Sequence, residues 1–170
     1  TLEKLDISDN EIINDATNRE AGKLLSGLLK QNTVLTALDI SENLAFSDSY
    51  SLPFVEEFAV GLRTNNMLKT LLMGANGLRG AAVGKALADA IAANTGLQEL
   101  NLSGGRFLYE ECDSPFVKAL SVGLDANSTL AKFDISGNHI GAGGAHTLAA
   151  ALKDNLVLLD LNVADIELGL

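Results

Sequence analysis

The sequence predicts an α/β solenoid, a right-handed coil of repeated strand–helix units with a parallel sheet. Two observations support this fold class. An apolar triplet of the form L-x-x-L-x-L recurs along the chain, and each recurrence is followed by a helical apolar pattern that ends at an asparagine. One such unit cannot bury its apolar face alone, so neighbouring units must stack into a continuous core.

The apolar triplet predicts six strands. Successive first leucines are 33, 33, 29, 33 and 26 residues apart, so the last unit is shortened. The triplets are Leu2/Leu5/Ile7, Leu35/Leu38/Ile40, Leu68/Leu71/Met73, Leu97/Leu100/Leu102, Leu130/Phe133/Ile135 and Leu156/Leu159/Leu161. Eight residues after the first leucine, four units have an asparagine (Asn10, Asn43, Asn76 and Asn138), whereas Gly105 and Ala164 stand there in the other two. These asparagines are expected to bond to neighbouring loop backbone.

A second asparagine ends each predicted helix, and apolar residues three, seven and ten positions before it form one helix face. These asparagines are Asn32, Asn65, Asn94, Asn127 and Asn155. The pattern predicts helices over residues 18–30 and 53–63 and in the units 67–94, 96–127 and 129–155. The terminal asparagine is expected to stop the helix in the left-handed conformation. Pro53 and Pro115 suit a first helical position, where a missing N–H costs nothing.

The L-x-x-L-x-L-x-x-N frame resembles the leucine-rich repeat family, specifically its ribonuclease-inhibitor-type repeats, over essentially the whole chain. The resemblance implies a curved, horseshoe-shaped solenoid that has the parallel sheet on its concave side and the helices on its convex side. It also implies that the chain binds another protein. Gly105, Ala164, Phe133 and Leu72 depart from the frame. Residues 1–170 are expected to form a single domain of about five repeats plus a terminal strand. We expect this domain to be a fragment of a longer array.

The amino-acid composition limits the classes of partner that the chain can bind. The net charge of −10 opposes nucleic acid and anionic membranes and favours a protein with a basic surface. The single cysteine, Cys112, and the lack of an apolar run of membrane-spanning length predict a reducing compartment, the cytoplasm. The glycines near residue 141 lack the GK[ST] that a phosphate loop requires, and the two histidines have no ligand set at metal spacing. We therefore expect no catalysis, no cofactor and no metal.

Two sets of residues are candidates for partner binding. The first is a column of outward positions on the concave sheet, although a merely solvated acidic face would look the same. It consists of Asp6, Asp39, Leu72, Asn101, Asp134 and Asp160. The second is a set of aromatic residues in insertions between strand and helix, at 45–52 and 106–114, which could instead plug their own loops. It consists of Phe46, Tyr50, Phe107 and Tyr109.

The leading hypothesis is a non-catalytic protein-interaction or scaffold domain. One alternative is a regulator of an enzyme, similar to the Ran GTPase-activating protein, although its catalytic residues find no matching positions here. Another is a cytoskeletal cap similar to the tropomodulin repeat domain. Self-association through uncapped ends is also open, because residues 1–8 form an edge strand and Val157 and Leu158 are expected to point outward.

Overall fold

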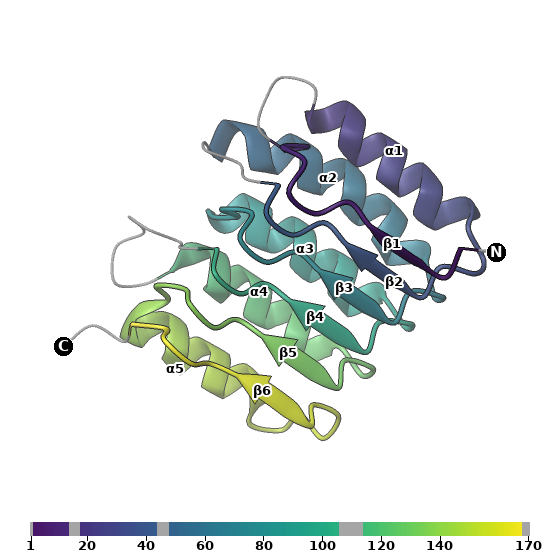
Figure 1. The fold of residues 1–170 in the computed structure, drawn as a ribbon. Helices are drawn as coiled ribbons and strands as arrows, with labels where there is room; N and C mark the ends of the chain where they lie inside the picture. Colours follow the sequence, from purple (N-terminus) through teal and green to yellow (C-terminus); the bar gives the residue numbers. More distant parts are fainter. Residues whose placement is uncertain (1, 14–17, 44–47, 106–113, 168–170) are drawn as a thin grey trace.

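The computed structural model describes residues 2–13, 18–43, 48–105 and 114–167, with side chains of the second helix described from residue 51. It shows a six-stranded parallel sheet in the spatial order β1 to β6, with the helices on one face (Figure 1). The elements are β1 Lys4–Asp6, α1 Asn18–Gln31, β2 Ala37–Asp39, α2 Asp48–Thr64, β3 Thr70–Leu72, α3 Ala81–Ala93, β4 Glu99–Asn101, α4 Pro115–Ala126, β5 Lys132–Asp134, α5 Gly141–Leu152 and β6 Asp160–Asn162. The predicted solenoid is confirmed.

Each strand is only three residues long, so its middle residue points into the core and its two flanking residues point outward. Leu38, Leu71, Leu100 and Phe133 occupy the middle positions and are fully buried. They belong to one cluster of buried side chains that runs from Ile13 to Leu148 without a break. The sheet and helices therefore share a single core, as the nearest-neighbour stacking of repeats requires.

The first set of asparagines forms a ladder between repeats, as predicted. The Asn43 amide nitrogen donates to the Ile7 and Ile40 carbonyls, both at 3.0 Å. Its oxygen accepts from the Asn10 backbone N–H at 3.0 Å, and Asn76 accepts from the Asn43 N–H in the same way at 2.7 Å. Gly105 interrupts the ladder because it has no side chain to accept the next bond. The side chains of Asn43, Asn76 and Asn138 thus tie their own loops to the preceding repeat.

The second set of asparagines does not adopt the expected left-handed conformation. Asn94 and Asn127 are extended, with φ of −77° and −82°. The Asn94 oxygen accepts from the N–H groups of Gly96 and Leu97, which lead into β4. Its nitrogen donates to the carbonyls of Leu62 and Asn65 in the preceding repeat. This two-sided bonding, which needs an extended backbone, explains the asparagine better than a helix stop does.

The last repeat has a different register from the one expected. Leu161 pairs with Phe133 and Asn162 with Asp134, so the apolar triplet is Leu158/Leu161/Val163 and the last step is 28 residues. The triplet Leu156/Leu159/Leu161 was therefore wrong. Leu158 points inward and packs against the core, whereas Leu156 and Leu159 are 94% and 86% exposed. The slot equivalent to Asn138 is consequently Ile166 rather than Ala164.

The two prolines differ in position. Pro115 is the first residue of α4, and the Ser114 side chain caps the helix by accepting from the Val117 N–H at 3.3 Å. Pro53 instead lies inside α2, which begins five residues earlier at Asp48, so its predicted place at a helix start is wrong. The sequence before Pro53 extends the helix, and the proline falls late in its second turn.

The helices pack in close pairs, α1 with α2 and α3 with α4. A methyl group built on Gly22 would lie 2.5 Å from the Phe54 carbonyl oxygen, and one on Gly84 would lie 2.4 Å from that of Phe116. The reverse approach is equally tight, because a methyl group on Gly61 would lie 2.6 Å from the Ser26 Cα and one on Gly123 would lie 2.5 Å from the Ala88 Cα. Glycine is therefore required on both sides of each pair.

One turn position has a positive φ in every repeat, and in two neighbouring repeats the residues at this position differ only by a methyl group. Ala75 has φ 53° and Gly104 has φ 64°. A methyl group on Gly104 would meet only the Ala75 side chain, at 4.0 Å, so space is not the constraint. We expect Ala75→Gly to raise the free energy of unfolding by about 0.5–1 kcal/mol and Gly104→Ala to lower it by about 1 kcal/mol. Urea denaturation measures both, and effects of the same sign would contradict the backbone argument.

Candidate functional site

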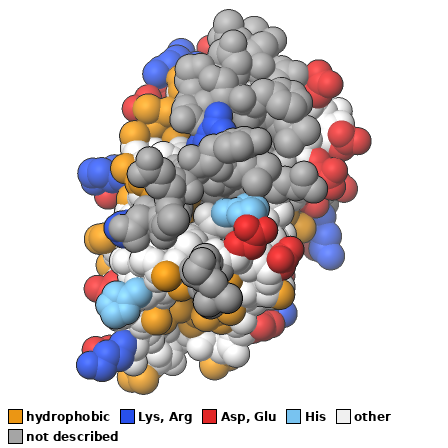
Figure 2. Space-filling view, turned by 90° about the vertical axis from the view of Figure 1, so that its left-hand side faces the viewer, with side chains coloured by type: hydrophobic (Ala, Val, Ile, Leu, Met, Phe, Trp, Pro, Cys, Tyr) orange, Lys and Arg blue, Asp and Glu red, His pale blue; other side chains and the backbone are white. Residues whose placement is uncertain are grey.

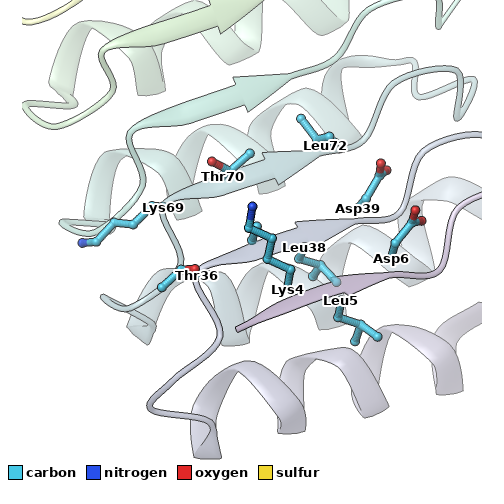
Figure 3. A pocket seen from close by; sticks show the side chains of 10 residues that line it. Lys4, Leu5, Asp6, Thr36, Leu38, Asp39, Lys69, Thr70 and Leu72 are labelled. Atoms are coloured by element: carbon cyan, nitrogen blue, oxygen red, sulfur yellow. The ribbon is translucent and has the colours of Figure 1, made fainter. Parts of the chain in front are cut away.

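The sheet face has a hollow of ≈ 480 Å³ over its first three strands (Figure 3). It is lined by Lys4, Leu5, Asp6, Thr36, Ala37, Leu38, Asp39, Lys69, Thr70 and Leu72. The acidic residues lie where the strands end, and Lys4 lies toward the strand starts, because parallel strands bring equivalent positions to the same edge. We call this hollow the concave site.

The two aspartates of the concave site are fixed by the turn that follows each strand. The Asp6 Oδ1 accepts from the Ser8 backbone N–H at 3.0 Å and from its hydroxyl at 2.7 Å. The Asp39 Oδ1 accepts from the Ser41 N–H at 2.9 Å. These local bonds orient the carboxylates and are the usual turn chemistry of aspartate before serine. The aspartates therefore have a structural role whether or not a partner binds.

The bonds to Ser8 also lower the pKa of the Asp6 carboxyl, the backbone N–H having the larger effect and the hydroxyl the smaller. Asp6 is therefore fully ionised at neutral pH. Because the folded-state pKa is the lower one, the stabilising effect is present above the unfolded pKa and is lost as the pH falls through the folded value. The negative charge at this end of the hollow persists across the physiological range.

The aspartates in the column differ in how much of each carboxylate is engaged. Among the described residues, Asp6 and Asp39 accept their hydrogen bonds at Oδ1, and neither Oδ2 accepts one. Asp134 accepts at Oδ1 from Ser136 and at Oδ2 from the Asn162 side chain at 3.0 Å. Asp6 and Asp39 are thus the better placed of the three to bind a cationic group.

The two lysines of the concave site also differ. Lys69 Nζ donates to the carbonyls of Asn66 and Gly96, at 3.2 and 3.1 Å, which holds it at the loop before β3. Lys4 extends over the sheet face in Figure 3. The hollow therefore places one amine opposite two carboxylates, with the apolar Leu72 beside them.

The structure places the predicted column as follows. Asp6, Asp39 and Leu72 come together in the concave site, and Asn101 and Asp134 continue the column in the next two strands. Asp160 was misplaced in the column: it pairs with Lys132, and Asn162 completes the column. Asp160 remains exposed on the sheet face, at the other outward position of β6. The three-residue step from Asn155 to Leu158, constant in all earlier units, would have given the correct register.

The second predicted set cannot be placed. Phe46, Phe107 and Tyr109 lie outside the described residues, and the Tyr50 side chain is not described either. Sequence reasoning also left out Thr36, Ala37 and Thr70, which line the hollow. Their uncharged side chains gave no signal on their own, although the outward position of Ala37 and Thr70 follows from the strand alternation once the register is fixed.

Acidic side chains gather along the right-hand edge of Figure 2, which views the rim where chains pass from strand to helix. Within the described residues, no cluster of three or more His, Cys, Asp or Glu side chains could hold a metal ion. None of the described helices is long and apolar enough to cross a membrane.

Comparison with known proteins agrees with this geometry. A family model described as "Leucine Rich repeat" matches residues 1–16 and 126–149. No curated protein sequence matches the chain. The fold is similar to a solved structure described as "Leiomodin-1 Actin-Binding Site 2 (ABS2)", with a TM-score of 0.63 and 19% identity over 89% of this chain and 79% of that one.

A second similar structure is the tropomodulin C-terminal domain of Caenorhabditis elegans. Its TM-score is 0.59, with 15% identity over 89% of this chain and 83% of that chain. At these identities the likeness establishes the fold. With the family match and the five stacked strand–helix units followed by a sixth strand, it identifies the fold as a leucine-rich repeat solenoid.

Proposed function

We propose that this chain is a non-catalytic protein-binding domain that engages a protein partner through the concave site. The observation that supports this most strongly is the hollow itself. The lining of its ≈ 480 Å³ of open space includes two oriented carboxylates, the Lys4 amine and the apolar Leu72. Charge with an adjacent apolar anchor is the composition that gives protein interfaces both orientation and residence time.

The chemistry of the site favours a partner with a basic surface. An arginine or lysine entering between Asp6 and Asp39 would meet two carboxylate oxygens, while an acidic group nearby would meet Lys4. The net charge of −10 would add long-range attraction that weakens with salt. We place the domain in the cytoplasm, because Cys112 has no second cysteine in the chain with which to form a disulfide.

The rim insertions are the second part of the proposed surface. Phe46, Tyr50, Phe107 and Tyr109 are half of the eight aromatic residues of the chain. Aromatic side chains supply much of the binding energy in protein interfaces when they are buried by a partner. In this proposal the charges of the concave site mainly set the association rate, and the aromatic residues of the insertions mainly set the dissociation rate.

Actin is the first partner to test, because one of the structures with a similar fold is an actin-binding site of leiomodin-1. The experiment is co-sedimentation with actin filaments and inhibition of pyrene-actin polymerisation, at 50 and 200 mM salt. We expect the double variant Asp6→Asn/Asp39→Asn to bind roughly tenfold more weakly than the parent, because the cationic group of the partner loses its counter-charges.

The matched control is Asp134→Asn, which removes a carboxylate from the same column at a position already bonded to Asn162. Its affinity should stay within about twofold of the parent. Equal weakening by the control and the double variant would show that general charge, rather than the concave site, drives binding. Failure of the parent chain to bind either form of actin would eliminate actin.

A regulator of a GTPase is the second candidate, and the repeat architecture alone supports it. A turnover assay with purified Ran and GTP, with and without the domain, separates the two. Acceleration of GTP hydrolysis would contradict the non-catalytic proposal, whereas binding without acceleration would agree with it.

A further inference from the structure

The close pairing of helices alternates with open junctions. Between α2 and α3 the surface has a hollow of ≈ 430 Å³ lined by Arg63, Asp89, Ala92 and Ala93. A second hollow of ≈ 260 Å³ lies between α4 and α5, next to Val122 and Thr147. At the α4–α5 junction, a methyl group on Gly144 would lie 3.6 Å from the Ser114 Cβ and 3.7 Å from the Val117 Cβ, which is ordinary contact, unlike the clashes at Gly22, Gly61, Gly84 and Gly123. The structural unit is therefore a pair of repeats.

The second helix of each pair has a distinctive sequence. Residues 53–65 read PFVEEFAVGLRTN and residues 115–127 read PFVKALSVGLDAN. Both have phenylalanine directly after the proline and glycine four residues before the final asparagine. Phe54 and Phe116 are fully buried, and the glycine of the first helix packs against their backbone carbonyl groups. We call repeats with this helix partner repeats, and the repeats of α1, α3 and α5 leading repeats.

α5 matches the first helix of a pair. Gly141, with φ 63°, opens it as Gly80, with φ 82°, precedes α3. Counting back from the terminal asparagines, Ala145 stands where α3 has Gly84, and Ala149 stands where α3 has Ala88. Ala88 is buried against α4, whereas Ala149 is exposed. On α3 this face is covered by the partner repeat that contains α4. The equivalent face of α5 is therefore uncovered.

The open face is apolar. A hollow of ≈ 240 Å³ lies between α5 and β6, and every residue around it is apolar. They are Ile140, Ala145, Leu148, Ala149, Leu152, Leu161, Val163 and Ile166. Leu161 and Val163 are 40% and 37% exposed, although their equivalents Phe133 and Ile135 are fully buried one repeat earlier. Figure 2 shows hydrophobic side chains gathered at this end of the molecule.

We propose that the α5–β6 end is a docking face for one partner repeat, whose strand pairs with β6 and whose helix covers Ala149. The α3–α4 interface supplies the template, because the same positions continue onto α5. In that template the buried Phe116 fills the space beside the leading helix, and Gly123 lets the backbones approach. On α5, phenylalanine would fill the apolar hollow and glycine would lie over Ala149.

A second copy of the chain fits this face less well. It would present β1 and α1, and α1 has Leu28 where partner repeats have Gly61 or Gly123, and Ala21 where they have Phe54 or Phe116. A leucine side chain could not enter a space in which even one added carbon lies 2.5 Å from Ala88. The docking face therefore selects a partner repeat over a leading one.

Ala145 keeps a docked partner repeat farther from α5 than α4 lies from α3 in the template. A methyl group at Gly84 would lie 2.4 Å from a backbone oxygen, whereas ordinary contact begins near about 3.4 Å. A partner repeat must consequently sit about 1 Å farther from α5 than α4 does from α3. Ala145→Gly removes this obstacle, which gives the proposal a variant expected to strengthen docking.

The test is a fusion protein in which a copy of one repeat follows Ile166, so that the added repeat directly continues residues 1–166. One fusion adds residues 106–136, a partner repeat, and the control fusion adds residues 77–103, a leading repeat. Amide hydrogen exchange of α5 is the measurement. We expect protection to rise at least tenfold in the partner fusion and less than threefold in the control. Ala145→Gly should raise it further in the partner fusion.

Ala149→Leu in the partner fusion should abolish the gain, while in the unextended chain it should change nothing, because Ala149 is exposed there. Equal protection by both fusions, or insensitivity to Ala149→Leu, would overturn the proposal. Sedimentation of the unextended chain supplies the other decisive outcome. A concentration-dependent dimer that protects α5 would mean that a second copy is the occupant, and the selection for a partner repeat would be wrong.

Discussion

Replacing Asn94 with alanine is expected to lower the free energy of unfolding by about 3–5 kcal/mol. The side chain is 2% exposed and makes four hydrogen bonds. Two join the end of α3 to the strand that follows, and two join it to the preceding repeat. Alanine would leave two buried N–H groups and two buried carbonyls without their partners, and each such loss costs about 1–3 kcal/mol before relaxation.

Asn155→Ala is the matched control, because this asparagine stands at the same position in the last repeat. Its oxygen accepts from the N–H groups of Val157 and Leu158, and the residue is partly exposed. Water can replace these bonds, so the expected loss is about 1 kcal/mol. Guanidinium denaturation of both variants measures the difference. Equal losses would mean that the bonds between repeats contribute little.

The strands and helices could be predicted because their signals are local and repeated. The triplet gave five of six strands in the correct register and the order of all six, since a solenoid keeps sequence order in space. The sixth failed because Leu156 and Leu159 are leucines that the structure leaves exposed. Hydrophobicity alone could not separate them from Leu158, whereas the fixed spacing from Asn155 could.

The concave site was predicted in part. The alternation of a strand places Asp6 and Asp39 on one face, and the sequence shows this directly. That they share a hollow with Lys4 and Thr70 depends on how neighbouring strands stack, which no single repeat encodes. The left-handed asparagine was wrong for a similar reason. Its bonding partners, such as Leu62 and Asn65, lie in another repeat.

A single column of small residues does not predict the paired packing of the helices. Ser26, Ala59, Ala88 and Ser121 all seemed equivalent as small side chains, yet only Ser26 and Ala88 face a glycine of the next helix. Close approach is a property of two helices together. The long and short units, 33 and 29 residues, already alternate in the second half of the chain, and this was the available signal.

Gly123→Ala is expected to lower the free energy of unfolding by about 2–3 kcal/mol, although alanine is the better helix former. The added methyl group would lie 2.5 Å from both the Cα and the carbonyl oxygen of Ala88. Backbone atoms cannot rotate away as a side-chain tip can, so α3 and α4 must separate along their whole contact. The buried side chains between them, among them Phe116 and Leu120, would lose packing as a result.

Gly27→Ala makes the same chemical change inside α1, where nothing lies within 4 Å of the added methyl group. Only helix propensity acts there, so we expect the free energy of unfolding to rise by about 0.5–1 kcal/mol. The two variants should therefore shift the thermal midpoint in opposite directions. If Gly123→Ala also stabilised the fold, α3 and α4 would not be in close backbone contact. The proposed docking at α5 would then lose its template, because it repeats the α3–α4 contact one pair further along the chain.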